Sequence, residues 1–289
     1  MKIDVLDTNA CYRTMLRQPE NKRDAYFIRQ MLDPFAPLFA MTQLPMSPKA
    51  LGCLALSGRD EEALQMLDRL SRADVWTSAG TACARTGKAC RDAGLQVPDS
   101  LKLGILLGDP EQQSLNGGYT GIGSLPGFIL IIVAPDAANL AKIPACVAHE
   151  CHHNILFNNL TWHFMDVTLR QYLAIEGLAD SLATSLYGAD SLGTWVTGAS
   201  GEDLALARDV IGAHLDTAGF MAVRPYMYGD HPMIQSDKVT GIPYCGGYAV
   251  GFHAVQAWLN VSGQTAAEAT RAFIDGADIV GQSGYFGSG

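Results

Sequence analysis

The spacing of apolar residues divides the chain into helical and extended stretches. Over the first hundred residues, apolar positions recur at the period of an amphipathic helix, with charged positions between them. Gly94 and the prolines at positions 34 and 37 supply helix ends. We therefore expect a helical N-terminal lobe over residues 1–100, with helices at 23–32, 59–70 and 78–93.

A small sheet is predicted directly after this lobe. The runs LKLGILLG, from Leu101, and GFILIIVAP, from Gly127, are apolar and β-rich. Between them lies NGGYTGIGSLPG, residues 116–127, whose Asn-Gly-Gly and Pro-Gly pairs are turn signals. We expect these runs to form part of a sheet with one glycine-rich edge.

Helical spacing returns at residue 143 and continues to the end of the chain. Ser200 with Asp203, and Thr265 with Glu268, have the spacing of capping boxes at helix starts. The pattern as a whole indicates an α+β fold, mainly helical, with a small mixed sheet. The helices predicted after the sheet are 143–158, 168–187, 201–218 and 247–263, followed by a last one that opens at Thr265.

Composition and charge narrow the class of protein. The chain has 289 residues, 48% of them hydrophobic and 17% charged, which is typical of a globular protein. A formal net charge of -9 without a basic cluster argues against nucleic acid as the main partner. The apolar run 128–133 is too short to span a bilayer, and the N-terminus lacks a signal-peptide pattern, so we expect a cytoplasmic protein. Seven cysteines without a C-x-x-C pair favour reduced thiols.

The stretch VAHECHHNIL, residues 147–156, contains an H-E-x-x-H element. His149 and His153 lie one helical turn apart, so their imidazoles share a face and can bind one metal ion. Glu150 projects beside that face, where it can take a proton from a metal-bound water. Cys151 and His152 point elsewhere, Cys151 as a buried small residue and His152 as a packing or supporting group. The alternative is a histidine-rich, partly exposed helix that binds no metal.

A catalytic zinc site needs a third protein ligand and an open position for water. The metzincin pattern is excluded, because Leu156 and Asn159 stand where it requires glycine and histidine. His163 could be the ligand, but it lies beyond the expected end of the helix. Glu176 is the better candidate, because its carboxylate lies in the apolar segment YLAIEGLADSLATSLYG and needs a partner there. Asp180, one turn later, could accept the second N–H of a zinc-bound histidine, although surface ion pairs would also account for both acids.

An H-E-x-x-H element followed on a later helix by Glu-x-x-x-Asp resembles the gluzincins, the thermolysin-like metallopeptidases. The blocks VAHECHHNILFN, IEGLADSLATSLYG and IPYCGGYAVGFHAVQAWL are similar to an uncharacterised bacterial family of predicted zinc-dependent proteases, over about residues 100–289. The resemblance implies a zincin-like catalytic domain over 101–289, with an edge strand beside the H-E-x-x-H helix. It also implies His149, His153 and Glu176 as the ligands of Zn²⁺, with Glu150 as the base.

These residues predict a zinc-dependent metallopeptidase that cleaves a peptide or protein substrate with a water activated by Glu150. A further donor would stabilise the oxyanion, and Tyr248 is the first candidate for it. His231 is the second, and Tyr244 and His253 are weaker candidates. The glycine-rich stretch before the second β-rich run could bring a strand close to an extended peptide, or it could be a plain hairpin.

Two other functions are compatible with the same motif. One is a non-catalytic zinc-binding scaffold or sensor, and the other is a zinc amidase that acts on a small substrate. The presence of Glu150 favours catalysis over a scaffold, because a structural zinc site needs no base and usually closes with four protein ligands. The sequence does not separate a peptidase from an amidase.

Overall fold

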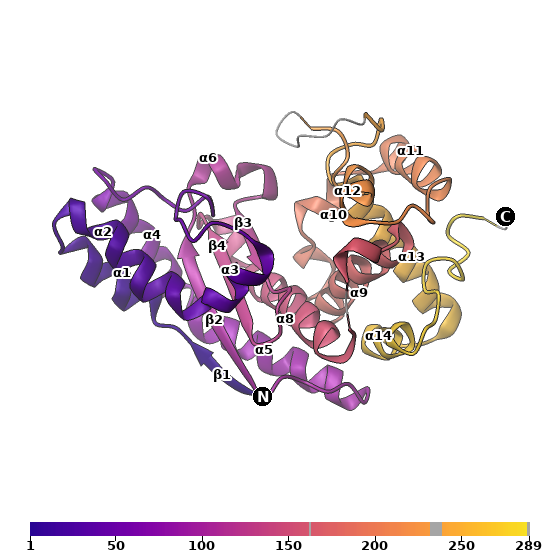
Figure 1. Cartoon of the computed structure of the whole chain (residues 1–289), viewed down its shortest axis with the longest axis horizontal. Helices are drawn as coiled ribbons and strands as arrows, with labels where there is room; N and C mark the ends of the chain where they lie inside the picture. The colour runs from indigo at the N-terminus through magenta and orange to yellow at the C-terminus, as the bar shows by residue number, and fades with distance from the viewer. Residues whose placement is uncertain (162, 232–238, 288–289) are drawn as a thin grey trace. The chain divides into compact units, whose positions relative to one another are not determined.

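Four strands form one mixed sheet in the computed structural model (Figure 1). β1 (Lys2–Val5), β2 (Ser100–Leu107) and β4 (Phe128–Val133) are parallel, and β3 (Tyr119–Ile122) pairs antiparallel with β4. The strand order β1-β2-β4-β3 places glycine-containing β3 at an edge. The central strands β2 and β4 are the two apolar runs of the sequence, buried along most of their length. The α+β class and the small mixed sheet are therefore confirmed.

The structure describes residues 1–161, 163–231 and 239–287. They fall into two units. Unit 1 comprises Met1–Lys88 and Val97–Asn158, and unit 2 comprises Ala89–Gln96 and Asn159–Gly289. Unit 1 contains the sheet, whose first strand, β1, lies within the segment 1–100 that is predicted to be a helical lobe. The division of the chain at residue 100 remains a prediction.

Helices α1 and α4 of unit 1 contact the central strand β2. The predicted helices 59–70 and 78–93 correspond to α4 and α5. The predicted helix 23–32 is instead α2 followed by a π-helical turn, Ile28–Leu32. The helices that begin in unit 1 are α1 (Thr8–Leu16), α2 (Glu20–Phe27), α3 (Ala36–Thr42), α4 (Asp60–Arg72), α5 (Val75–Asp92), α6 (Pro110–Gln113), α7 (Ala137–Leu140) and α8 (Ile143–Asn159).

The described part of unit 2 is built from helices. Thr265 and Glu268 form the predicted capping box, whereas Ser200 makes no side-chain hydrogen bond at the start of its helix. The helix predicted over 201–218 ends at Gly212, because the carbonyls of Leu215 and Thr217 accept hydrogen bonds from the first amides of α9. The helices are α9 (Leu169–Tyr187), α10 (Thr194–Thr197), α11 (Gly201–Gly212), α12 (Phe220–Tyr228), α13 (Gly246–Ser262) and α14 (Ala266–Ile274).

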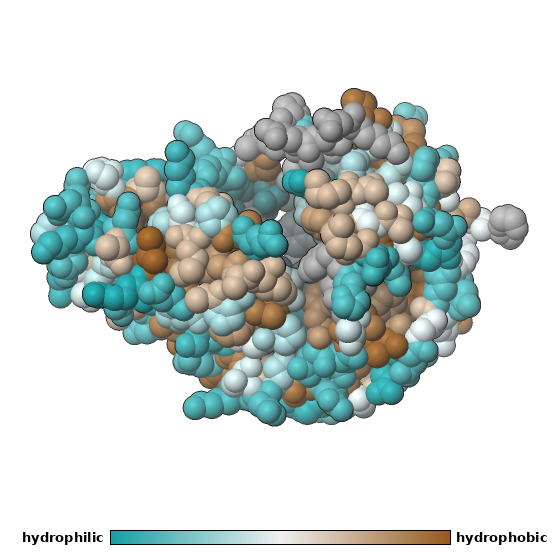
Figure 2. All heavy atoms as spheres, in the orientation of Figure 1, coloured by the Kyte–Doolittle hydropathy of each residue, from teal (hydrophilic) through white to brown (hydrophobic). Residues whose placement is uncertain are grey.

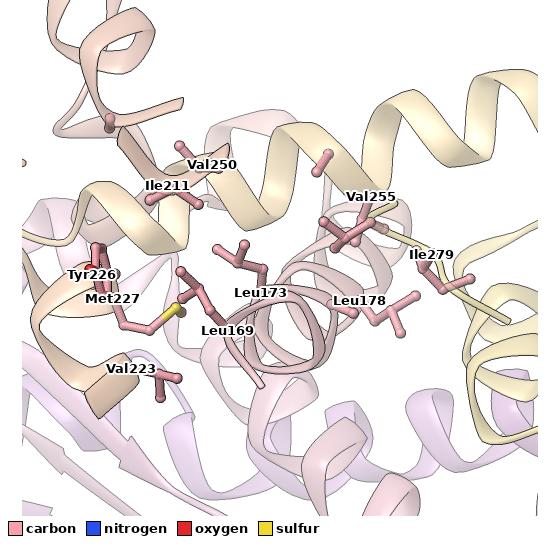
Figure 3. Packing of buried hydrophobic residues seen from close by; sticks show 14 of the residues in the cluster. Leu169, Leu173, Leu178, Ile211, Val223, Tyr226, Met227, Val250, Val255 and Ile279 are labelled. Atoms are coloured by element: carbon pink, nitrogen blue, oxygen red, sulfur yellow. The ribbon is translucent and has the colours of Figure 1, made fainter. Parts of the chain in front are cut away.

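Helices α9 and α13 cross closely in the core of unit 2 (Figure 3). A Cβ atom at Gly177 of α9 would overlap the carbonyl oxygen of Gly251 in α13, and one at Gly251 would lie 2.6 Å from the carbonyl oxygen of Leu173. Only glycine permits this approach of two backbones. The crossing matters for the candidate site because Glu176 precedes Gly177 and Tyr248 lies one turn before Gly251.

The exposed side chains are mostly polar. Figure 2 shows hydrophilic residues over much of the visible face, with hydrophobic residues among them. Exposed large apolar side chains include Met165 and Met221 in unit 2. None of the helices within the described residues combines the length and the apolar character needed to cross a bilayer.

Candidate functional site

The H-E-x-x-H element lies on α8, which is buried along most of its length. The Nε2 atoms of His149 and His153 face each other at 2.9 Å, and the two rings are nearly perpendicular, at 86°. Their side chains are only 6% and 7% exposed, so the alternative of an exposed histidine-rich helix is wrong. Two imidazole nitrogens at this distance share either a proton or a metal ion, because two facing lone pairs repel each other.

The separation of these nitrogens can be compared with that in a zinc site. Tetrahedral zinc with imidazole ligands at about 2.0–2.1 Å holds their nitrogens about 3.3 Å apart. The distance of 2.9 Å is about 0.4 Å shorter, a difference that small rotations of the side chains would close. The pair of histidines therefore fits a zinc ion.

Glu150 lies against the hairpin formed by β3 and β4. A Cβ atom at Gly121 would overlap its carboxylate, and one at Gly123 would lie 2.8 Å from its Oε2 atom. The glycines are thus needed for the close approach of the edge strand to this side chain. The expectation that a glycine-rich edge strand lies beside the H-E-x-x-H helix is confirmed within unit 1.

The other residues of the motif pack as predicted. Cys151 is fully buried, and its thiol points to the carbonyl oxygen of Cys83 at 3.8 Å. His152 is also fully buried, with its ring 6.0 Å from that of His153. All seven cysteines are free thiols. His163, the alternative third ligand, is exposed.

Helix α9 of unit 2 carries the two acids singled out in the sequence. It begins at a capping box in which Thr168 and Gln171 bond reciprocally. Glu176 is 8% exposed and Asp180 is 3% exposed, so surface ion pairs do not account for them. The indole N–H of Trp195 donates to both carboxylate oxygens of Asp180, at 3.3 Å each. Trp195 thereby fixes the direction of a buried carboxylate.

Three tyrosines gather beside Glu176. The hydroxyls of Tyr172, Tyr228 and Tyr248 are joined by hydrogen bonds, and the rings of Tyr228 and Tyr248 lie 5.6 Å apart. Burial raises the pKa of each tyrosine, and the negative charge of Glu176 raises it further. The three hydroxyls therefore stay protonated near neutral pH and can act as donors.

Tyr228 shares this environment with Tyr248. Both hydroxyls are buried, hydrogen-bonded within the trio and subject to the negative charge of Glu176. Tyr228 therefore joins Tyr248 as a candidate donor.

The remaining predicted donors have other neighbours. The ring of His231 lies 4.9 Å from that of Tyr244, near the start of α13. His253 stacks on Tyr285, with the planes 10° apart, and its half-burial lowers its pKa. His253 therefore packs against the C-terminal segment.

Comparison with known proteins connects these motifs to a family. Residues 75–277 match the family described as Predicted Zn-dependent protease (DUF2268). The chain belongs to this family. It is 36% identical over 291 residues to the uncharacterised protein YjfC of Bacillus subtilis strain 168, which covers 95% of this chain and 96% of YjfC. The uncharacterised protein YjaZ of the same organism is 28% identical over 134 residues, 45% of this chain and 47% of YjaZ.

The family match includes α8, α9 and α13, and therefore all the candidate site residues. The sequence pattern indicates the histidines and the acids as candidates, but it does not indicate Tyr172, Tyr228 or Trp195. The signal that could have found Tyr172 is its position one turn before Glu176 on the same helix face. Trp195 and Tyr228 come from other segments, and the sequence contains no spacing rule that connects them with α9.

Proposed function

We propose that the protein is a zinc-dependent metallopeptidase of the gluzincin type, with a zincin-like catalytic fold. The observation that carries this proposal is the pair of facing imidazoles on α8, with Glu150 held between this helix and a glycine-rich edge strand. Membership of a family of predicted zinc-dependent proteases supports the same class of reaction.

His149, His153 and Glu176 are the proposed zinc ligands. All three are buried, and their ligand atoms are of the kinds that could hold a metal ion. Asp180 is the proposed acceptor for the second N–H of one of the histidines, since a ligating imidazole commonly donates to a carboxylate. In this arrangement the net charge of a buried carboxylate such as Glu176 is compensated by the ion.

A bound zinc ion supplies Lewis acidity, which lowers the pKa of water and polarises a substrate carbonyl. Glu150 accepts the proton of the attacking water and returns it to the leaving amine. A tyrosine hydroxyl, from Tyr248 or Tyr228, donates to the oxyanion. His231 remains the second choice for that role.

The substrate is proposed to be an extended peptide. The outer edge of β3 is not paired with another strand among the described residues, and its backbone groups can bond to a peptide in the manner of an added strand. A small amide would not use this edge. A peptide substrate therefore explains both the zinc residues and the edge strand.

Metal analysis and a peptide assay test the proposal together. Purified wild type should contain one zinc per chain and cleave a fluorescence-quenched peptide library, and chelation should abolish cleavage. H149A, H153A and E176A should lose zinc, whereas E150Q should keep zinc and lose about 10²–10⁴-fold in turnover, the usual contribution of a general base.

H163A is the matched control, because His163 is exposed and was the alternative ligand. It should keep both zinc and turnover. Wild type that binds no zinc would contradict the proposal, and full turnover by E150Q would remove Glu150 from its role. Zinc binding without cleavage of any peptide would favour the scaffold or the amidase.

A further inference from the structure

Asn154 is a fully buried polar side chain that neither the motif nor the proposed mechanism uses. It lies on α8 one turn after Glu150, so the two side chains leave the helix on the same face. Both are directed to the same feature of unit 1, the hairpin that joins β3 to β4.

The amide of Asn154 makes three hydrogen bonds to the turn of this hairpin. Its Nδ2 donates to the carbonyl oxygens of Gly123, at 2.6 Å, and Phe128, at 3.0 Å. Its Oδ1 accepts the backbone N–H of Gly127 at 2.6 Å. One side chain thus holds both ends of the turn, and both of its donor hydrogens are used.

Gly123, whose carbonyl oxygen accepts a hydrogen bond from Asn154, also lies against Glu150. A Cβ atom at Gly123 would lie 2.7 Å from the Glu150 Cβ and 2.8 Å from its Oε2. The backbone at Gly123 therefore limits the positions that the carboxylate can take. Its own position is set by the bond from Asn154.

We infer that Asn154 is a positioning residue, which fixes the β3–β4 turn so that Gly123 holds the Glu150 carboxylate in its working orientation. The inference rests on the proposed function, because it assigns Glu150 the role of base. Asn154 acts on turnover rather than on zinc binding, since neither histidine depends on the turn for its place on α8.

Asn154→Leu tests this role, because leucine keeps the approximate volume and removes all three hydrogen bonds. We expect zinc content to stay at one per chain, hydrogen exchange of segment 123–128 to accelerate, and kcat to fall about 10- to 100-fold, as for a small misplacement of a reacting group. KM should change less than kcat. Asn154→Asp is the second variant, for use if the leucine variant does not fold. It keeps the shape of the side chain and the oxygen that accepts the Gly127 N–H, but it loses the two donor hydrogens. Its kcat should also fall.

Gly123→Ala supplies the partner for a double-mutant cycle. Alone it should lower kcat with zinc retained, because the new methyl group would meet the Glu150 carbonyl oxygen as well as its side chain and so move the turn away from the carboxylate. If Asn154 acts through Gly123, the losses in Asn154→Leu and Gly123→Ala should not multiply in the double variant, whereas two independent effects should multiply.

Asn159→Leu is the matched control. Asn159, at the end of the same helix, bridges the backbone of Gln96 by donating to its carbonyl oxygen at 2.6 Å and accepting its N–H at 3.0 Å. Its replacement should leave kcat unchanged. Wild-type kcat in both folded Asn154 variants, or losses that multiply in the cycle, would overturn the positioning role alone. Absence of peptide cleavage by the wild type would overturn the proposed function, and this result is obtained from the wild type alone, without the variants.

Discussion

The two carboxylates proposed to work at one zinc ion have contrasting neighbours. Glu150, on α8 of unit 1, lies against the main chain of two glycines. Glu176, on α9 of unit 2, lies beside the hydroxyls of three tyrosines. A carboxylate that takes up and returns a proton needs access to the attacking water and the substrate. A carboxylate that binds a metal ion benefits instead from fixed dipoles around it.

The same contrast holds for the residues that position them. In unit 1, Asn154 acts on backbone, through three hydrogen bonds to one turn. In unit 2, Trp195 acts on a side chain, through its indole N–H to Asp180. We therefore expect substitutions around Glu150 to change turnover. Substitutions around Glu176 should change hydrogen-bond donation to the oxyanion, and those around Asp180 should change the affinity for zinc.

Among substitutions in unit 2, we expect those of the tyrosines to have the largest effect on kcat. Removal of the hydroxyl that donates to the oxyanion, by Tyr248→Phe or Tyr228→Phe, should lower kcat by about 10²–10³-fold with zinc content unchanged. The other of the two variants should have a smaller effect, because its hydroxyl bonds to the donor and not to the substrate. Steady-state kinetics on one peptide measure both.

Tyr226→Phe is the control for these variants, since Tyr226 is buried on the same helix but packs on His214, 4.8 Å between rings. It should retain kcat. The larger loss identifies the donor, and wild-type kcat in both variants would exclude both tyrosines from this role.

An intermediate effect is expected from Trp195→Phe, which keeps an aromatic ring and removes the N–H that Asp180 accepts. The affinity for zinc should fall about 10- to 100-fold, the usual cost of losing support for a ligating histidine. Competition with a chromophoric chelator measures it. Trp258→Phe, which removes an indole bond to Gln264, should leave the affinity unchanged. Equal affinities in all three proteins would show that the bond from Trp195 to Asp180 does not support zinc binding.

The smallest effect concerns stability. Gly251→Ala should destabilise the protein by about 1–3 kcal/mol, because the methyl group meets backbone at the α9–α13 crossing and neither helix can yield locally. Gly80→Ala, inside α5, meets only the end of the Val5 side chain at 3.3 Å, and should be near neutral, since alanine also favours the helix by about 1 kcal/mol. Urea unfolding followed by circular dichroism compares the two, and equal losses would mean that the crossing is not tight.

Those parts of the site that depend on spacing within one element could be predicted from the sequence. The period of the helix is enough to pair His149 with His153, and the apolar surroundings of Glu176 are enough to predict its burial. The turn residues around Gly121 predicted a glycine-rich edge, and the apolar runs predicted the central strands.

Features that depend on tertiary contacts could not be predicted in this way. The helix predicted over 201–218 ends early because the carbonyls of Leu215 and Thr217 bond to the start of α9. Trp195 and Tyr228 reach α9 residues from α10 and α12, and no local pattern encodes such partners. Asn154 was visible as a polar residue in an apolar helix, but its partners in the turn were not.

A crystal structure of the zinc-loaded protein, with anomalous data collected at the zinc absorption edge, would locate the metal ion among the proposed ligands. We predict one anomalous peak, with His149 Nε2, His153 Nε2 and a Glu176 carboxylate oxygen each about 2.0–2.2 Å from it. A peak at another place, or coordination by the two histidines with Glu176 directed elsewhere, would contradict it.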